Sequence, residues 1–472
     1  MKMRIKKSVC VGLDVHKNNV WACVCLKDPD SEKDTLIFKS KKFPSNHTDL
    51  CAMCNWAESI VAKKLGDDFS EPIEVYMEST GKYSTPVYNV CEECGLIPHI
   101  VNPKHVRTIA GQKTDQKDCA WIAELGINGL LRSSYIPPAD IRSARRLSRA
   151  RTKILHARQD DVRRAQNILT EANIRMDLIF SGVDGESARK VIDYLLETDE
   201  PDLEIVKGKI RRSCRIMTFR TNEERKEKEE ELLKAFDGAK FSPSQKFELR
   251  STYLRIDNSN KQIRSYEDMM EETLGDYKEE LKLIQSVPGF SRLSAMQVLA
   301  EIGPDMKQFG NSKNFISWCG LCPASNQSNS KHKSVKCGKG GRYLKPVLIQ
   351  CALNAVHDPY YEGKYKAISA RRGKKRALIA IARKMMVAVY HMLLNGEYFH
   401  PTIPAEELNP DIDDDDMNQY TADTEESYRQ AEIQKTAAEL IALTDDKDLE
   451  LKNKIQQLLS QLGLQEIAVL NP

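Results

Sequence analysis

The sequence lacks three features that would each identify a different class of protein. No apolar run approaches the roughly 20 residues of a membrane-spanning helix, so we expect no membrane association. The basic N-terminus leads into a strand-like segment and not into a signal-peptide core with a cleavage site, which predicts a cytoplasmic protein. The glycine-rich stretch 336–342 lacks the Gly-x-x-x-x-Gly-Lys-Ser/Thr order of a nucleotide-binding P-loop.

Cysteine is abundant, with 13 among 472 residues. Disulfides are not expected in a long chain without a secretion signal. Three pairs have the Cys-x-x-Cys spacing of some zinc sites, which leaves structural zinc as an alternative to free buried thiols. These pairs are Cys51/Cys54, Cys91/Cys94 and Cys319/Cys322. We favour free thiols, because the first pair lies in a helix-like run and the third in an apolar turn.

The net charge of +3 conceals a strong segregation of charge along the chain. Residues 142–164 contain nine Lys or Arg and two acids, and residues 331–384 contain 15 Lys or Arg and two acids. Residues 401–430 contain ten acids and one Arg, and we expect 402–430 to be flexible. Two basic segments predict contact with a polyanion, although a basic helix face that is merely solvated is the alternative.

The first 140 residues predict a mixed α/β domain. Strands enriched in Val, Ile, Trp and Phe are expected at 8–15, 19–26, 35–40, 73–78 and 96–101. Apolar residues at helical spacing predict helices at 46–65, 83–94, 103–110 and 114–126. This order, three strands and then alternating helices and strands, is that of a ribonuclease-H-like fold.

The rest of the chain reads as mainly helical. A long basic helix is expected from 140 to about 172, and the charge-rich stretch to 283 predicts a helical or coiled-coil arm, with a plain helical bundle as the alternative. Helices are expected at 293–302, 342–357 and 374–395, and a final helix near 446–463. The predicted domains are therefore 1–140, 141–283, 284–400 and 401–472.

Four acids in the first domain form the principal candidate site. Asp14 and Glu78 end two apolar strands, and Asp115 and Asp118 lie three residues apart on one side of a predicted helix. Hard divalent cations prefer oxygen ligands, and two such ions can flank a phosphodiester during in-line attack. The four acids therefore predict a catalytic site that binds Mg²⁺, or Mn²⁺ in its place.

Basic side chains in two segments are candidates for contact with nucleic-acid backbone. The turn Val287-Pro288-Gly289 before a helix resembles a helix-hairpin-helix element, which holds phosphates without reading bases. The candidate nucleic-acid-binding residues are Arg142, Arg145, Arg146, Arg149 and Lys153 in the first segment, and Lys331, Lys333, Lys336, Lys339 and Arg342 in the second.

A Ser/Asn/Lys-rich loop occupies residues 325–334. A serine hydroxyl can attack phosphorus when a metal ion or a base activates it. Polar runs of this kind are commonly solvated loops, so the loop alone does not identify a nucleophile.

Several motifs together resemble one family. Gly12-Leu13-Asp14-Val15-His16-Lys17, Met77-Glu78-Ser79-Thr80-Gly81 and Lys113-Thr114-Asp115-Gln116-Lys117-Asp118 are similar to the N-terminal DEDD domain of the IS110 group of insertion-sequence transposases. The segments 287–303, Trp318-Cys319-Gly320-Leu321-Cys322-Pro323 and Gly340-Gly341-Arg342-Tyr343-Leu344-Lys345 resemble the C-terminal transposase domain of that group.

The resemblance implies a DNA recombinase that excises and inserts a mobile element. In the family, a RuvC-like domain with four metal-binding acids acts with a nucleophilic serine that lies in a loop after Gly-Leu-x-Pro. That position falls on Ser328 here, with Ser330 as the alternative. The resemblance also implies a transient phosphoserine–DNA bond, a structured bridge RNA that pairs with donor and target DNA, and a homodimer or homotetramer.

Two other functions fit the same residues. A metal-dependent DNA nuclease or Holliday-junction resolvase would use the four acids to activate water, and Ser328 would have no part. A non-catalytic nucleic-acid-binding relative would bind DNA or RNA without cleavage. The presence of all four acids argues against the second alternative.

Overall fold

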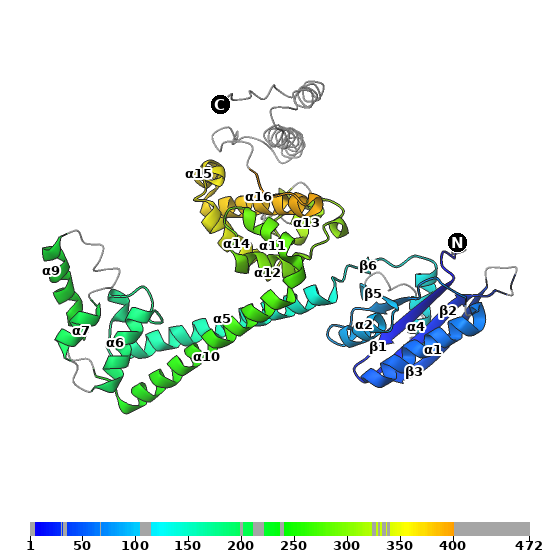
Figure 1. The fold of residues 1–472 in the computed structure, drawn as a ribbon, viewed down its shortest axis with the longest axis horizontal. Coiled ribbons are helices and arrows are strands. Elements are labelled where there is room, and N and C mark those ends of the chain that lie inside the picture. Colours follow the sequence, from blue (N-terminus) through cyan, green and yellow to red (C-terminus); the bar gives the residue numbers. More distant parts are fainter. Residues whose placement is uncertain are drawn as a thin grey trace, which may run out of the picture. The chain divides into compact units, whose positions relative to one another are not determined.

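The protein divides into two compact units, Met1–Pro137 and Pro138–Pro472, in a computed structural model (Figure 1). The residues that the structure describes are 5–29, 31, 35–66, 68–103, 115–198, 202–210, 221–236, 240–322, 327–328, 331–332, 337 and 340–400. The predicted helix at 103–110 lies almost wholly outside these residues, and the acidic segment and the final helix lie fully outside them.

The first unit is built on one mixed sheet of order β3-β2-β1-β4-β5-β6. β1, β2 and β3 are antiparallel neighbours, β4 and β5 continue the sheet parallel to β1, and β6 is antiparallel to β5. The strands are β1 (Val9–Val15), β2 (Asn19–Lys27), β3 (Leu36–Pro44), β4 (Glu74–Glu78), β5 (Ile97–Val101) and β6 (Ser133–Ser134).

Helices cover both faces of this sheet. Alternate residues of β1 point to opposite faces, as strand geometry requires. Val9, Val11 and Leu13 join the core under α1 (His47–Leu65) and α2 (Ser84–Glu93), whereas Cys10 joins the core under α4 (Asp115–Ile127). The five predicted strands and three of the predicted helices are confirmed, with ends that shift by a few residues.

The second unit contains two hydrophobic cores that share a pair of long helices, α5 (Ala139–Glu171) and α10 (Pro243–Thr273). The pair is antiparallel, because Arg151 binds Glu267 while Asp161 binds Arg255. One core also contains residues of α6 (Glu186–Glu197) and α7 (Leu203–Ile210), and α9 (Asn222–Leu233) packs on α7.

The other core of this unit is formed where the first turns of α5 meet six helices (Figure 1). They are α11 (Lys278–Ser286), α12 (Arg292–Ile302), α13 (Ser312–Trp318), α14 (Leu344–Ala355), α15 (Pro359–Arg372) and α16 (Lys374–Asn395). α13 and α15 were not predicted, because α13 is short and α15 is rich in charge and aromatic residues.

α16 departs from the expectation that no apolar run approaches the length of a membrane-spanning helix. By length and composition alone it could cross a membrane, and it is the one such helix among the described residues. In the structure its apolar side chains, among them Ile381, Met385, Met386 and Val389, are buried in the core that it shares with α13, α14 and α15. The run is thus the central helix of a folded core.

Candidate active site: an acidic edge and a serine loop

Asp14 and Glu78 lie next to each other at the same edge of the sheet. The parallel register pairs Leu13 with Met77, so the residues that follow them occupy neighbouring positions at the ends of β1 and β4. Both acids have the strand parity of Gly12 and Tyr76, which places them on the face that α4 covers. Both are half-buried, which suits carboxylates that must hold a ligand.

Gly12 fixes how α4 lies on β1. A Cβ atom at this position would lie 2.2 Å from the carbonyl oxygen of Cys119 and 2.4 Å from the amide nitrogen of Ala123. At Gly126, a Cβ would lie 2.3 Å from the Cys10 sulfur. Backbone therefore touches backbone where β1 and α4 cross, and the chain directions are opposed, since residues later in α4 lie beside residues earlier in β1.

This register brings the start of α4 to the acidic edge. Asp115 begins α4 one turn before Cys119, a rise of about 6 Å for an α-helix. Asp14 lies two residues beyond Gly12, an advance of about 7 Å along a strand. The backbone of Asp115 is thus level with Asp14, and Asp118 precedes the residue that contacts Gly12.

The electrostatic surroundings of Asp14 agree with this placement. The pKa of the buried Cys119 thiol is raised, first by its hydrogen bond with Cys23, next by burial, and also by the negative charges of Cys23 and Asp14. His16 Nε2 lies 3.0 Å from Asp14 Oδ2, so the imidazole shares this edge. His16 was not among the predicted site residues, and its position two residues after an acid at a strand end was the one sequence signal for this contact.

The residue types at this edge are chemically suited to Mg²⁺ or Mn²⁺, because two strand ends and the start of one helix bring backbone that carries acidic residues to it. Among the side chains that the structure describes, no group of three or more His, Cys, Asp or Glu is already arranged to hold a metal ion. The side chain of Asp115 lies outside that described set. The assignment of Asp14, Glu78, Asp115 and Asp118 as metal ligands stays a prediction.

In the second unit, three glycines close the base of the loop that carries Ser328. A Cβ atom at Gly320 would lie 2.2 Å from the carbonyl oxygen of Gly340, and one at Gly341 would lie 2.1 Å from the carbonyl oxygen of Cys319. Gly320 and Gly341 also have positive φ angles of 73° and 63°, which L side chains rarely adopt. The two ends of the loop, at Gly320 and Gly341, are therefore held together by contacts between backbone atoms.

Ser328 lies in a short hairpin within this loop. β7 (Gln327–Ser328) pairs antiparallel with β8 (Lys331–His332), and Ser328 faces Lys331 across the ladder. The residues between the strands, Asn329 and Ser330, and the side chain of Ser328 lie outside the described part of the chain. The backbone places Ser328 at the hairpin's turn end, and its role as nucleophile stays a prediction.

Two of the arginines that were predicted to bind nucleic acid are engaged within the protein. Arg145 donates to the carbonyl oxygens of Ala300 (3.0 Å) and Glu301 (2.8 Å) at the end of α12. Arg149 donates through Nε and Nη2 to the two carboxylate oxygens of Glu301, each at 2.8 Å. This edge of the basic stripe therefore faces α12, whereas Arg146 and Lys153 are exposed.

The other basic candidates are only partly described. Arg142 is half-buried, and Arg342 is exposed with its guanidinium 5.8 Å from the ring centre of Tyr343. Lys331 has a described backbone in β8, but Lys333, Lys336 and Lys339 lie outside the described residues. Their contact with nucleic acid stays a prediction.

The Pro-Gly turn between α11 and α12 is closely packed. A Cβ atom at Gly289 would lie 2.4 Å from the carbonyl oxygen of Cys351 on α14, so this turn is held against that helix. Ser291 caps α12 by accepting from the Ser294 amide. One N-terminal donor of α12 is thereby already used, which reduces what the turn can offer to a phosphate.

The described cysteines are free thiols. Two of the Cys-x-x-Cys pairs come together where α1 packs on α2. Within this group, the pKa of Cys54 is raised, chiefly by its hydrogen bond with Cys91 and then by burial.

Comparisons with known proteins agree on one family. A family model for the DEDD transposases of IS110, described as "Transposase", matches residues 11–174. A second, described as "Transposase IS116/IS110/IS902 family", matches residues 281–366. The chain is also similar to the "Transposase for insertion sequence element IS1111A" of Coxiella burnetii (strain RSA 493 / Nine Mile phase I). The identity is 23% over 332 residues, which cover 69% of this chain and 79% of the relative.

Proposed function

The chain belongs to the IS116/IS110/IS902 family of transposases and is a DNA transposase, and from this premise we propose how its two units divide the reaction. The first unit is a RuvC-like, ribonuclease-H-like domain whose acids bind Mg²⁺. The second unit supplies Ser328 as the nucleophile. The observation that carries the proposal is the register of α4 on β1. This register brings the start of α4, where Asp115 and Asp118 lie, to the edge where the strands that carry Asp14 and Glu78 end.

The sheet supports the assignment of the first unit. Three antiparallel strands are followed by two strands parallel to the first, and the acids lie on β1, β4 and the helix that covers their common face. Asp14, Glu78, Asp115 and Asp118 would hold the metal, which when bound stabilises negative charge on the oxygens of the reacting phosphate. The acids themselves fix the position of the phosphate relative to the sheet edge.

Ser328 would exchange one phosphodiester bond for another. Its Oγ forms a bond to phosphorus, the bond from phosphorus to a deoxyribose oxygen breaks, the serine proton leaves to a base or to water, and the released oxygen takes up a proton. Because the number of phosphoester bonds is unchanged, the free DNA hydroxyl can later attack the phosphoserine and rejoin a strand. The glycine contact at the loop base supports this role, since it holds both ends of the loop at one place.

DNA is the substrate of this enzyme class, and we propose two further partners. A structured bridge RNA would select donor and target DNA, with Arg146, Lys153 and Arg342 as exposed cations that can reach phosphates. A second copy of the chain would be needed because strand exchange requires paired sites, and the acids of one subunit would serve Ser328 of another. RNA that copurifies with the protein, sequenced and compared with the DNA beside the gene, tests the first of these proposals.

A cleavage assay separates this mechanism from its rivals. A duplex that carries one end of the element is incubated with Mg²⁺ and wild-type, Asp14→Ala or Ser328→Ala protein. We expect both variants to lose cleavage by at least about 100-fold, as removal of a group that stabilises the transition state does. Unchanged cleavage by Ser328→Ala would favour a water-using nuclease or resolvase. Binding by the wild-type protein without cleavage would favour a non-catalytic relative.

A further inference from the structure

Arg149 lies at the junction of three segments that are far apart in the sequence. It projects from α5, its guanidinium makes a two-point hydrogen bond with Glu301 of α12, and its central carbon lies 4.7 Å from the ring centre of Tyr343. Tyr343 is the residue just before α14 and follows Gly340 and Gly341 closely. The contact therefore joins a long helix of the second unit to the returning end of the serine loop.

Glu301 makes this junction stiff. Its side chain is 7% exposed and most of its buried neighbours along α12 are apolar, so an unpaired carboxylate here would be strongly unfavourable. Arg149 binds both carboxylate oxygens, and Arg145 binds the two backbone carbonyl oxygens beside them. The hydrogen bond to Glu301 is also the main cause that raises the pKa of Arg149, so the guanidinium stays charged. A paired, planar fork of this kind holds one orientation.

Arg149 also places its guanidinium over the ring of Tyr343. A cation over an aromatic ring is attracted to the ring face, and the contact strengthens where water is partly excluded. Tyr343 is half-buried, and two residues before it Gly341 makes the backbone contact with Cys319 that closes the loop. Arg149 and Tyr343 thus link α5 to the loop base.

We propose that Arg149 and Tyr343 are positioning residues for Ser328: they fix the base of the serine loop to α5, so that displacement of α5 moves the nucleophile. The proposal rests on the proposed role of Ser328 and adds the part of the fold that governs its placement. It gives a function to a basic residue that otherwise reads as a phosphate contact.

Three substitutions in the full-length protein test the proposal. Tyr343→Leu removes the ring, Arg149→Lys removes the two-point bond at a partly exposed side chain, and Tyr343→Phe keeps the ring face. The matched control is Arg189→Met, because Arg189 also lies over a tyrosine, Tyr253, at 3.9 Å, but in the core remote from the loop. Thermal unfolding confirms that each protein is folded.

The first measurement is hydrogen–deuterium exchange of the peptides that span 320–342, which needs no substrate. We expect faster exchange there in Tyr343→Leu and Arg149→Lys, and exchange as in the wild type in Tyr343→Phe and Arg189→Met, because a loop that loses its anchor opens more often. Unchanged exchange in both Tyr343→Leu and Arg149→Lys would overturn the proposal.

The second measurement is the single-turnover rate at which a covalent protein–DNA species forms on the element-end duplex, with the Kd for the same duplex measured beside it. We expect a fall of about tenfold in the rate for Tyr343→Leu and Arg149→Lys at unchanged Kd. A rise in Kd proportional to the fall in rate would instead show that these residues bind DNA. If Ser328→Ala still forms the species, the proposed nucleophile is wrong, whatever the exchange data say.

Discussion

The absence of a side chain at Gly12 sets the distance between the acids of the sheet and those of α4. We predict that Gly12→Ala destabilises the first unit by about 1–3 kcal/mol, the usual cost of overpacking, because the added methyl meets backbone atoms that cannot rotate away. The cleavage rate should fall by more than the loss of folded protein explains, since α4 carries Asp115 and Asp118. Chemical denaturation and the cleavage assay measure the two effects.

Gly208→Ala is the matched control for this substitution. Gly208 lies in α7, and a Cβ atom there would have no neighbour within 4 Å. The change should leave stability unaltered or raise it by about 0.5–1 kcal/mol through the better helix propensity of alanine. Equal destabilisation by the two substitutions would contradict the close packing of α4 on β1.

Lys384 leads us to expect that the stability of the protein depends on pH. Burial, together with the positive charge of Lys364, lowers the pKa of Lys384 to about 7. Between that value and the ordinary pKa near 10.4 the unfolded chain binds more protons than the folded one. Stability should therefore rise as the pH increases through this window, and it should fall as the pH decreases toward 7.

Denaturant unfolding of the wild type and of Lys384→Met isolates this effect. The variant should have its greatest advantage at about pH 6.5, and that advantage should shrink by about pH 9 as the wild-type lysine loses its proton. An advantage that does not change with pH would mean that Lys384 keeps its ordinary pKa. The rings of Tyr360 and Tyr361, 4.1 Å and 6.0 Å from Nζ, favour the charged form and oppose the shift.

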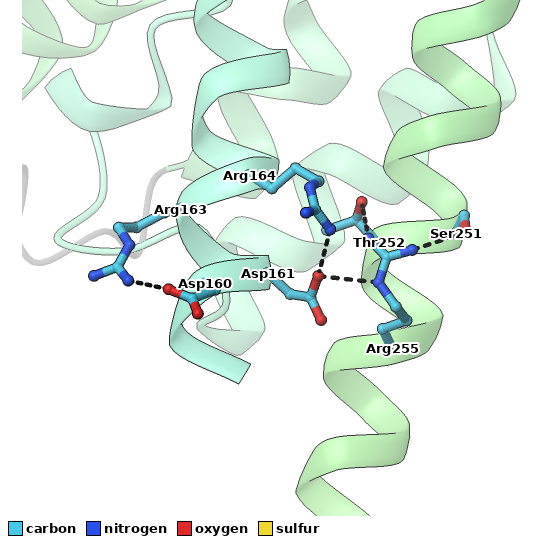
Figure 2. A network of polar contacts seen from close by, with 7 residues as sticks. All are labelled: Asp160, Asp161, Arg163, Arg164, Ser251, Thr252 and Arg255. Atoms are coloured by element: carbon cyan, nitrogen blue, oxygen red, sulfur yellow. Dashed lines mark hydrogen bonds and ion pairs between the residues drawn. The ribbon is translucent and has the colours of Figure 1, made fainter. Parts of the chain in front are cut away.

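At the scale of elements, α5 and α10 are joined by polar contacts along the middle of their length. Figure 2 shows Asp161 of α5 between Arg164 of the same helix and Arg255 of α10, with distances of 2.9 Å and 3.0 Å. The neighbouring Asp160 pairs only with Arg163 among the residues drawn. Asp161 is largely buried, whereas Asp160 is exposed.

These two adjacent acids make a matched pair of substitutions. We predict that Asp161→Ala destabilises the second unit by about 1–3 kcal/mol, because it removes a largely buried carboxylate that accepts from both Arg164 and Arg255. Asp160→Ala should change stability by less than about 0.5 kcal/mol, as exposed ion pairs do. Thermal unfolding of both variants decides the matter, and similar losses would mean that the α5–α10 contact does not depend on Asp161.

The elements themselves were largely predictable, and their contacts were not. Enrichment in Val, Ile, Trp and Phe located β1 to β5, and apolar residues at helical spacing located α4 and α5, because these side chains pack into the cores. The same periodicity cannot tell an arginine that faces phosphate from one that faces Glu301, more than 150 residues away. The one available signal was an acid inside the apolar stretch Leu299–Ile302, because a buried carboxylate needs a cation.

The candidate site divides in the same way. The positions of Asp14 and Glu78 at strand ends could be predicted, because the change from an apolar strand to polar residues is a local feature of the sequence. The register of α4 could not be, because it depends on which helix backbone meets Gly12, and the contact of Asp14 with His16 had only the short spacing of the two residues as a signal. Ser328 came from family resemblance alone.

At the scale of the whole molecule, the acids and the serine belong to different units. If the acids of one subunit serve the serine of another, a Ser328→Ala subunit and an Asp14→Ala subunit should restore activity when mixed. Random exchange between dimers would return about one quarter of the wild-type cleavage rate, since half of the dimers keep one complete site. No recovery, with exchange verified by differently tagged subunits, would place both groups in one chain.

In the proposed mechanism, Ser328 carries the DNA strand during the reaction. The most direct measurement traps the protein on an element-end duplex with Mg²⁺, digests the complex and locates the attached nucleotide by mass spectrometry. We expect a phosphodiester on Ser328, which is lost in Ser328→Ala and Asp14→Ala and after removal of the metal. Strand cleavage without any covalent species, or a nucleotide on Ser330, would contradict this mechanism.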